Sequence, residues 1–367
     1  MTFSAALDTD KKKEETSMMK KCILFLSCLG FIFAIPIQGK CEALKREDIS
    51  YNLGVFGNIN YKTKDRDTQH HSFSLGELDL YGTANYERMS FLTELLIEFE
   101  GQAIELDMER IWIGYSFSDL FTLRAGRHHT SLGYWNRTYH HGKQLFVTVE
   151  RPFVIAFEGE GGIIPAHIVG LEAEGRVSVG AINLKYELQV GNGPTITSEG
   201  KLDPNNSSDD NPSKEWVARL SGTSPVLPGF TFGLSGTSFK ITQADNTIIN
   251  EKVAGLDVSY IRGELDLLGE VFRLKNSDKE ARLGYVQAAY NISKYSVTPY
   301  VRHERMDVED GDPYLDALGG RKDRTQDIAG ARYDINERSS LKAQYRRDKE
   351  KSLDTKNVFE VQWTFAF

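Results

Sequence analysis

Two pairs of adjacent histidines are the residues of this chain best suited to metal binding. His128-His129 and His140-His141 lie close together in the sequence, and three glutamates follow them, the first being Glu150. Imidazole nitrogens together with carboxylates are common ligands of Zn²⁺, Cu²⁺ and Ni²⁺. Neighbouring side chains on an extended chain point in opposite directions, however, so neither pair can chelate an ion by itself. We therefore expect histidines that pack a loop and change its charge near neutral pH, with no metal ligands and no cofactor.

Hydrolytic catalysis is the second chemistry to consider. A hydrolase needs a nucleophile, a base and an orienting partner in contact. The chain contains neither G-x-S-x-G nor H-E-x-x-H. Ser131 beside His128 or His140 is the conceivable nucleophile and base. We expect that the protein is not an enzyme and keep a hydrolase as an alternative.

The N-terminal region has the pattern of an export signal. Residues 1–17 form a polar extension, which an over-extended start would explain. Residues 18–43 then combine Lys20 and Lys21 with the apolar run 22–37 and a small-residue cleavage site, as a secretory signal peptide does. A single transmembrane anchor is the alternative, but the apolar run is shorter than the ~20 residues that a helical span needs.

Cleavage after residue 43 would leave a mature chain, 44–367, without cysteine. Cys22, Cys28 and Cys41 all lie before that point, which excludes a disulfide scaffold, a cysteine metal site and a thiol nucleophile. The 367-residue sequence has a net charge of −8, which argues against nucleic acid as a partner. Its mean hydropathy of −0.40 excludes a protein with many helical membrane spans.

The mature chain shows period-two alternation of apolar and polar residues, which predicts strands. In 182–190 the apolar residues Ile182, Leu184 and Tyr186 alternate with Asn183 and Lys185. Sixteen such segments follow one another: 50–61, 73–86, 88–99, 104–117, 121–128, 168–178, 181–190, 215–223, 230–240, 251–261, 264–273, 281–290, 295–304, 325–334, 339–347 and 357–367. Connections after odd-numbered segments are long and those after even-numbered ones short, apart from one short connection at 100–103.

This arrangement is typical of a transmembrane antiparallel β-barrel of sixteen strands. In a bilayer each backbone N–H and C=O needs a partner, so a strand protein must close on itself. Its outer face then meets lipid and must be apolar, while its inner face meets water and must be polar. We expect no second apolar layer inside. A soluble β-protein is the alternative, but aromatic residues near the segment ends favour the membrane.

The last residues and three short motifs resemble known outer-membrane proteins. The ending 363–367, Trp-Thr-Phe-Ala-Phe, is similar to the C-terminal signature that the barrel-assembly machinery reads through a final phenylalanine, here Phe367. The motifs at 190–193, 298–304 and 330–334 resemble the family of phosphate-selective porins O and P. The resemblance implies a sixteen-stranded barrel, a homotrimer, a lysine-rich constriction and a third loop that folds inward.

The connection 129–167 stands in the position of that third loop and is the longest in the chain, which itself suggests a functional role. Lys143 is its only lysine, and its first half is basic. Whether the loop folds inward or forms an external flap stays open. If the polar side of each strand faces inward, the inner wall of the barrel is rich in acidic residues. In 104–117 the same assignment turns Arg110 and Trp112 toward lipid.

Opposed charges at a narrow aperture would orient dipolar solutes and exclude apolar ones. The candidates for its positive side are Arg124, Arg127, His128, Arg137, His140, Lys143, Arg302 and Arg346. The candidates for its acidic side are Glu94, Glu98, Glu105, Asp107 and Glu304.

We therefore expect an outer-membrane porin of a diderm bacterium, through which small hydrophilic solutes or ions diffuse passively. Its partners would be outer-membrane lipid, lipopolysaccharide and the solutes. A plugged structural or adhesive barrel is the alternative. The sign of the ion selectivity stays open.

Overall fold

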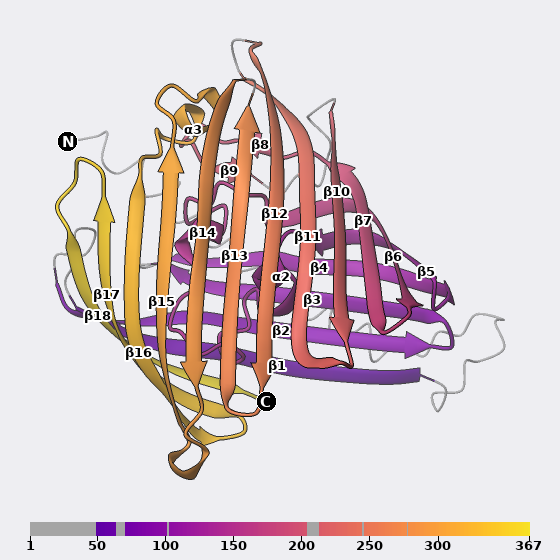
Figure 1. Ribbon diagram of the computed structural model, residues 1–367, viewed down its shortest axis with the longest axis horizontal. Helices are drawn as coiled ribbons and strands as arrows, with labels where there is room; N and C mark the ends of the chain where they lie inside the picture. Colours follow the sequence, from indigo (N-terminus) through magenta and orange to yellow (C-terminus); the bar gives the residue numbers. More distant parts are fainter. Residues whose placement is uncertain (1–48, 64–69, 101–102, 204–212, 244–245, 277) are drawn as a thin grey trace, which may run out of the picture. The chain divides into compact units, whose positions relative to one another are not determined.

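The computed structural model describes residues 49–63, 70–100, 103–203, 213–243, 246–276 and 278–367. The expected polar extension, signal peptide and cysteines all fall within 1–48, outside the described residues. The described residues form a closed barrel of sixteen antiparallel strands (Figure 1). The strands are β1 (Ile49–Lys62), β2 (Ser72–Tyr86), β3 (Met89–Glu100), β4 (Ala103–Ser118), β5 (Phe121–His129), β6 (His167–Val179), β7 (Ile182–Asn192), β10 (Lys214–Ser224), β11 (Leu227–Thr242), β12 (Ile248–Arg262), β13 (Leu265–Asn276), β14 (Lys279–Tyr290), β15 (Val297–Val308), β16 (Arg324–Asn336), β17 (Ser339–Glu350) and β18 (Lys356–Ala366).

Each strand of the barrel pairs with its neighbours in sequence. β7 pairs with β10, because the short β8 (Thr195–Ile196) and β9 (Leu202–Asp203) form a separate hairpin. The barrel closes where β1 meets β18, from Phe56 opposite Ala366 to Lys62 opposite Glu360. The sixteen predicted segments are confirmed as these strands. The alternation of long and short connections breaks a second time, since only 277–278 separate β13 from β14.

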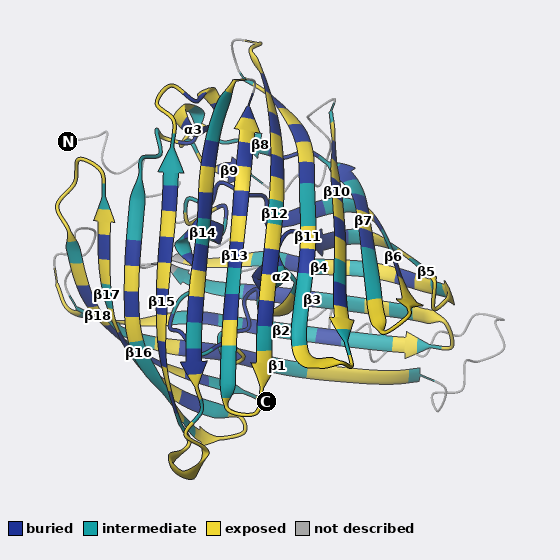
Figure 2. Ribbon diagram, viewed as in Figure 1, coloured by how far each residue is buried: buried dark blue, intermediate teal, exposed yellow. Residues whose placement is uncertain are grey.

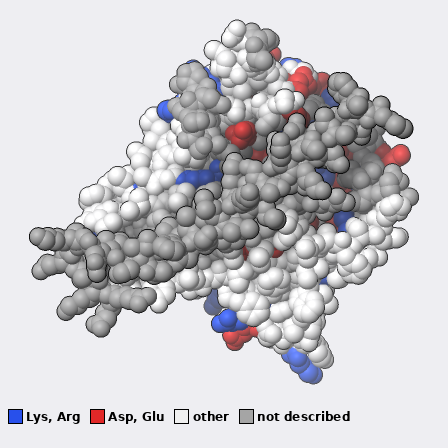
Figure 3. Space-filling view, turned by 180° about the vertical axis from the view of Figure 1, so that it is seen from behind, with Lys and Arg blue, Asp and Glu red and all other residues white. Residues whose placement is uncertain are grey.

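Apolar side chains cover much of the outer face of the barrel. Val286 and Val301 are 62% and 56% exposed, whereas Tyr285 and Arg302, one position away on the same strands, are buried. Figure 2 shows this alternation as bands of exposed and buried residues along β11 to β15. In Figure 3, broad areas of the visible described surface carry no charged residue. Among the described residues, the helices are too short or too polar to cross a bilayer.

The interior of the barrel contains an apolar core, and the expectation of no second apolar layer was wrong. Inward-facing residues such as Phe239, Phe272 and Leu283 pack with Trp135 and Tyr314 from two connections. Where the connections are described, they carry four short helices: α2 (Tyr134–Thr138), η2 (Phe153–Ile155), η3 (Ser293–Tyr295) and α3 (Pro313–Ala317). The alternation rule fails on this side of the barrel because folded connections, and not water, contact the inner face.

A bulge in β4 corrects the expected orientation of Arg110 and Trp112. The register with β3 shifts between Glu94 and Leu95, which leaves Glu109 as the extra residue on β4. A bulge reverses the sides to which the following residues point. Arg110 consequently faces inward and pairs with Glu94.

Candidate pore constriction

The long connection between β5 and β6, residues 130–166, lies inside the barrel. Its backbone hydrogen-bonds to inward-facing side chains of β13, β15, β17 and β18. Figure 1 shows its helix α2 behind β11 and β12. These contacts come from strands far apart around the barrel, so the segment crosses the lumen. We call residues 130–166 the lumen loop.

A carboxylate from the opposite wall holds the start of helix α2. Gly133 at the N-cap has φ +71° and supplies no side-chain cap. Glu270 of β13 accepts hydrogen bonds from the backbone N–H groups of Tyr134 (2.9 Å) and Trp135 (2.8 Å). Tyr285 donates its hydroxyl to the same carboxylate at 2.5 Å. Helix N–H groups need such acceptors, and a negative charge at this end is favourable.

Basic side chains of β15 and β17 hold the middle of the lumen loop. Arg302 donates to the carbonyls of Glu150 (2.9 Å) and Arg151 (3.3 Å) and also pairs with Glu304 at 2.8 Å. Lys342 donates to the carbonyl of Thr148 at 2.8 Å and also contacts the carbonyl of Lys143. The side chains of Arg302 and Glu304 are both 0% exposed. These two predicted constriction residues therefore anchor the loop backbone.

Apolar packing also holds the lumen loop. Trp135 is 0% exposed and packs against Phe146 and Tyr285, with ring centroids 4.8 Å and 6.0 Å apart. Tyr314 of helix α3 donates to the carbonyl of Ile163 at 2.8 Å. The apolar core thus fixes the loop on the β10 to β15 side.

A cavity of about 500 Å³ lies between the lumen loop and the part of the wall formed by β1 to β3 and β16 to β18. Its lining contains acidic and basic side chains in equal number: Glu77, Glu98, Glu150, Glu160 and Glu360, with Lys62, Lys143, Arg151, Arg324 and Arg346. Three predicted site residues, Glu98, Lys143 and Arg346, are thus brought to one water-accessible space.

Opposite charges that line this cavity pair with one another. Lys143 lies 3.7 Å from Glu77 and 3.6 Å from Glu150. Burial by itself lowers the pKa of Lys143, but the carboxylates of Glu150 and Glu77 outweigh it and hold the pKa above its ordinary value. Arg346 pairs with Glu360 at 3.0 Å. Positive and negative groups therefore lie within one narrow space.

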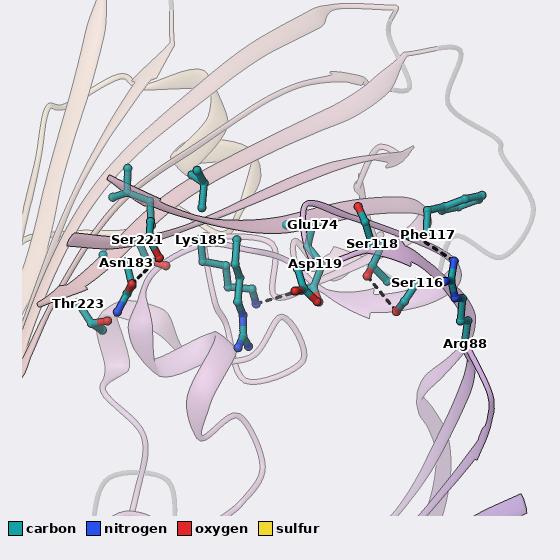
Figure 4. A pocket seen from close by; sticks show the side chains of 17 residues that line it. Arg88, Ser116, Phe117, Ser118, Asp119, Glu174, Asn183, Lys185, Ser221 and Thr223 are labelled. Atoms are coloured by element: carbon teal, nitrogen blue, oxygen red, sulfur yellow. Dashed lines mark hydrogen bonds and ion pairs between the residues drawn. The ribbon is translucent and has the colours of Figure 1, made fainter. Parts of the chain in front are cut away.

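A second cavity, of about 1110 Å³, opens at the short-turn end of β4 to β7 (Figure 4). Arg124 lies near it and pairs with Glu172 (2.5 Å) and Glu174 (2.6 Å). Lys185 lines the cavity and lies 3.0 Å from Glu174. Arg137, from helix α2 in the lumen loop, pairs with Glu187 and thereby ties the loop to this wall.

The remaining predicted residues lie along β3 to β5. Glu94 pairs with Arg110. Arg127 donates to the carbonyl of Glu109 at 3.0 Å and lies 3.7 Å from Asp107. Glu105 is exposed and lies opposite Glu98 in the strand register. His128 is buried and stacks on Trp112, with ring centroids 6.4 Å apart.

Glu109 is the centre of a histidine cluster that the sequence did not predict. His129, His140 and His167 each place Nε2 within 3.3 Å of Glu109 Oε1. The histidine pairs point to His129 and His140 but not to His167, which lies at the far end of the loop from His129. Antiparallel pairing of β5 with β6 makes these two residues direct cross-strand neighbours, so the loop boundaries were the available signal.

The possible catalytic pair does not form. Among the described residues, Ser131 Oγ has no hydrogen-bond partner. His140 directs its nitrogens at Asn136, Glu109 and His167. A serine nucleophile beside a histidine base is therefore not assembled at Ser131.

Comparisons with known proteins show which solved structures have a similar fold. No protein-family model and no curated protein sequence matches the chain. Among solved structures it is similar to the anion-selective porin from Comamonas acidovorans, with a TM-score of 0.59 and 15% identity over 87% of this chain and 100% of that one. It is also similar to OmpT of Vibrio cholerae, with a TM-score of 0.58 and 11% identity over 88% of this chain and 99% of that one. The outer-membrane channel DcaP of Acinetobacter baumannii gives the same four values. The chain has the fold of these outer-membrane proteins, and its resemblance to phosphate-selective porins remains a prediction.

Proposed function

We propose that this protein is an outer-membrane porin through which small hydrophilic solutes or ions diffuse passively. The observation that carries the proposal is a closed barrel, apolar outside, with one charged cavity beside the lumen loop and a second at the short-turn end of β4 to β7. Such a barrel satisfies its backbone in lipid and offers water a path through it. Diffusion needs neither a cofactor nor an energy source.

The lumen loop would then form the constriction, with Lys143 and Arg346 facing Glu98 and Glu360. Acidic and basic groups within one cavity would orient dipolar solutes and reject apolar ones. Arg302 and Glu304 would act by holding the loop. Six others of the proposed set would set the charge of the wall: Arg124, Arg127, Arg137, Glu94, Glu105 and Asp107. The buried His128 and His140 would act by packing.

Assembly and location are part of the same proposal. Export by a signal peptide, recognition of Phe367 by the barrel-assembly machinery and contact with lipid and lipopolysaccharide would bring the chain to the outer membrane. One solved structure of the similar OmpT is described as a trimer form. We propose a homotrimer here on that likeness. Small solutes are the proposed ligands, and the phosphate preference of the resembled family stays open.

A plugged barrel is the second candidate, because the apolar core fills the β10 to β15 side of the lumen. A liposome-swelling assay separates the two. Liposomes containing the folded protein are diluted into sugars of increasing size. A porin predicts swelling that is fast for small sugars and falls with size, and a plugged barrel predicts the rate of protein-free liposomes for every sugar.

A further inference from the structure

Four side chains from four separate places converge at one buried point inside the barrel. They are Glu109 at the β4 bulge, His129 at the end of β5, His140 in the lumen loop and His167 at the start of β6. Each offers one ligand atom, and these atoms all lie within 4.8 Å of one another. All four residues are buried.

The separations suit a small cation. His140 Nε2 and His167 Nε2 each lie 2.5 Å from Glu109 Oε1 and 3.0 Å from each other. His129 Nε2 lies 3.3 Å from the same oxygen. Tetrahedral Zn²⁺ with ligands at 2.0–2.2 Å keeps its donor atoms about 3.3 Å apart. His140 and His167 thus lie closer to Glu109 than a bound ion would hold them, while His129 already lies at the expected separation.

The outer contacts turn the lone pair of His140 toward the cluster. Nδ1 of His140 lies 2.8 Å from Asn136 Oδ1. The orientation of that amide is fixed, because Asn136 Nδ2 donates to the carbonyls of Thr130 and Ala166, both at 3.0 Å. His140 Nδ1 must therefore donate to Asn136, which leaves Nε2 as the atom able to bind a metal.

Two further groups lie directly behind the other ligands. Glu158 Oε2 lies 3.3 Å from His167 Nδ1, and Glu158 is itself held by the backbone N–H of Ala166 at 2.5 Å. The second oxygen of Glu109 faces His141 Nε2 at 3.3 Å. A carboxylate behind a ligating histidine is the usual outer contact of zinc sites.

The contact between His140 and Glu109 has no hydrogen between its two atoms, because Nδ1 carries the single proton of a neutral His140 ring. The lone pair of His140 Nε2 therefore repels Glu109 Oε1 unless a cation lies between the two atoms. The buried His129 Nε2 points at the same place and has no hydrogen-bond partner among the described residues. Glu77 and Glu158 lie one contact farther out, beyond His141 and His167, and would help to balance a divalent charge.

We propose that Glu109, His129, His140 and His167 bind one divalent transition-metal ion, with Zn²⁺ as the expected occupant. Three imidazole nitrogens and one carboxylate oxygen fill a tetrahedral shell and leave no position for substrate. The ion would tie the lumen loop, through His140, to β4, β5 and β6. The site would therefore be structural, and it does not depend on whether the barrel conducts.

Metal content of the folded protein in detergent tests the proposal directly. The protein is stripped with a chelator, equilibrated with Zn²⁺, separated from free ion by gel filtration and analysed for zinc. We expect about one zinc per chain. Replacing Zn²⁺ with Co²⁺ should give the strong visible absorption typical of tetrahedral cobalt, and this spectrum is measured on the unmutated chain.

Matched variants assign the ligands. His140→Gln should weaken zinc binding by more than tenfold, and Glu158→Gln by about tenfold, the lower end for loss of an outer contact. His303→Gln is the control, because His303 is exposed on β15 and pairs with Asp327. Heat-modifiable gel mobility shows whether each variant is folded. The proposal would be overturned if the wild-type protein bound no zinc and gave no cobalt spectrum. Equal zinc binding by folded His140→Gln and folded His303→Gln would also overturn it.

Discussion

Replacing Lys342 with methionine should release the middle of the lumen loop. Lys342 is 0% exposed, and its ammonium group donates to the carbonyl of Thr148 at 2.8 Å and to Gln362 Oε1 at 3.1 Å, in addition to its contact with the carbonyl of Lys143. Methionine has a similar length but no donor. The buried carbonyl of Thr148 and the half-buried carbonyl of Lys143 would then lose this partner, as would Gln362 Oε1.

The expected size of the effect follows from those two carbonyls. Each buried acceptor left without a donor costs about 1–3 kcal/mol, so loop docking should weaken by about 2–6 kcal/mol. A loss of about 3 kcal/mol raises the undocked population of the loop about 100-fold. The strands themselves keep their backbone pairing, so the barrel should still fold.

Single-channel recording and limited proteolysis measure this population. We expect Lys342→Met to show frequent excursions to a higher current level and faster cleavage within 143–151 of the folded protein. Lys349→Met is the control, because Lys349 is an exposed residue of the same strand. Identical current noise and identical protease protection in the two variants would refute the assigned role of Lys342.

Three further changes probe the same loop. Lys143→Glu should turn the balanced cavity acidic and shift the reversal potential in a KCl gradient toward cation preference; an unchanged potential would place the constriction elsewhere. Trp135→Ala should destabilise loop docking by about 3–5 kcal/mol, seen as faster loop proteolysis with the barrel still folded, and protection equal to wild type would contradict the apolar anchor. Gly133→Ala should weaken docking, because φ of +71° costs a non-glycine residue about 1–2 kcal/mol and the methyl group would collide with Glu270. Gly319→Ala is the control, because nothing would touch the methyl group added there. Equal protease sensitivity of the two variants would contradict the predicted strain at Gly133.

The strands could be predicted from sequence because their signal is local. In β7, Ile182, Leu184 and Leu188 lie on one side of the chain, and that period of two is enough to identify a strand. The β4 bulge also left a readable sign. Ile104 and Leu106 are exposed at even positions, whereas Ile111 and Ile113 are exposed at odd ones, so the apolar side changes between them.

Contacts made across the lumen could not be predicted in this way. Glu270 meets helix α2 from the far wall, and no spacing in the sequence relates Glu270 to Tyr134. The buried Phe239 and Leu283 read as ordinary strand residues, because alternation does not reveal which connection covers them. His167 became significant only once the strand register placed it beside His129.

Planar-bilayer conductance of the folded protein tests the central claim most directly. Steady, uniform current steps in KCl are the predicted result, because the barrel is closed, apolar outside and holds charged cavities beside the lumen loop and at the short-turn end of β4 to β7. The sign of the reversal potential in a salt gradient would then show which charges control the constriction. Protein that is demonstrably folded and inserted yet carries no current would contradict the porin and leave a plugged barrel.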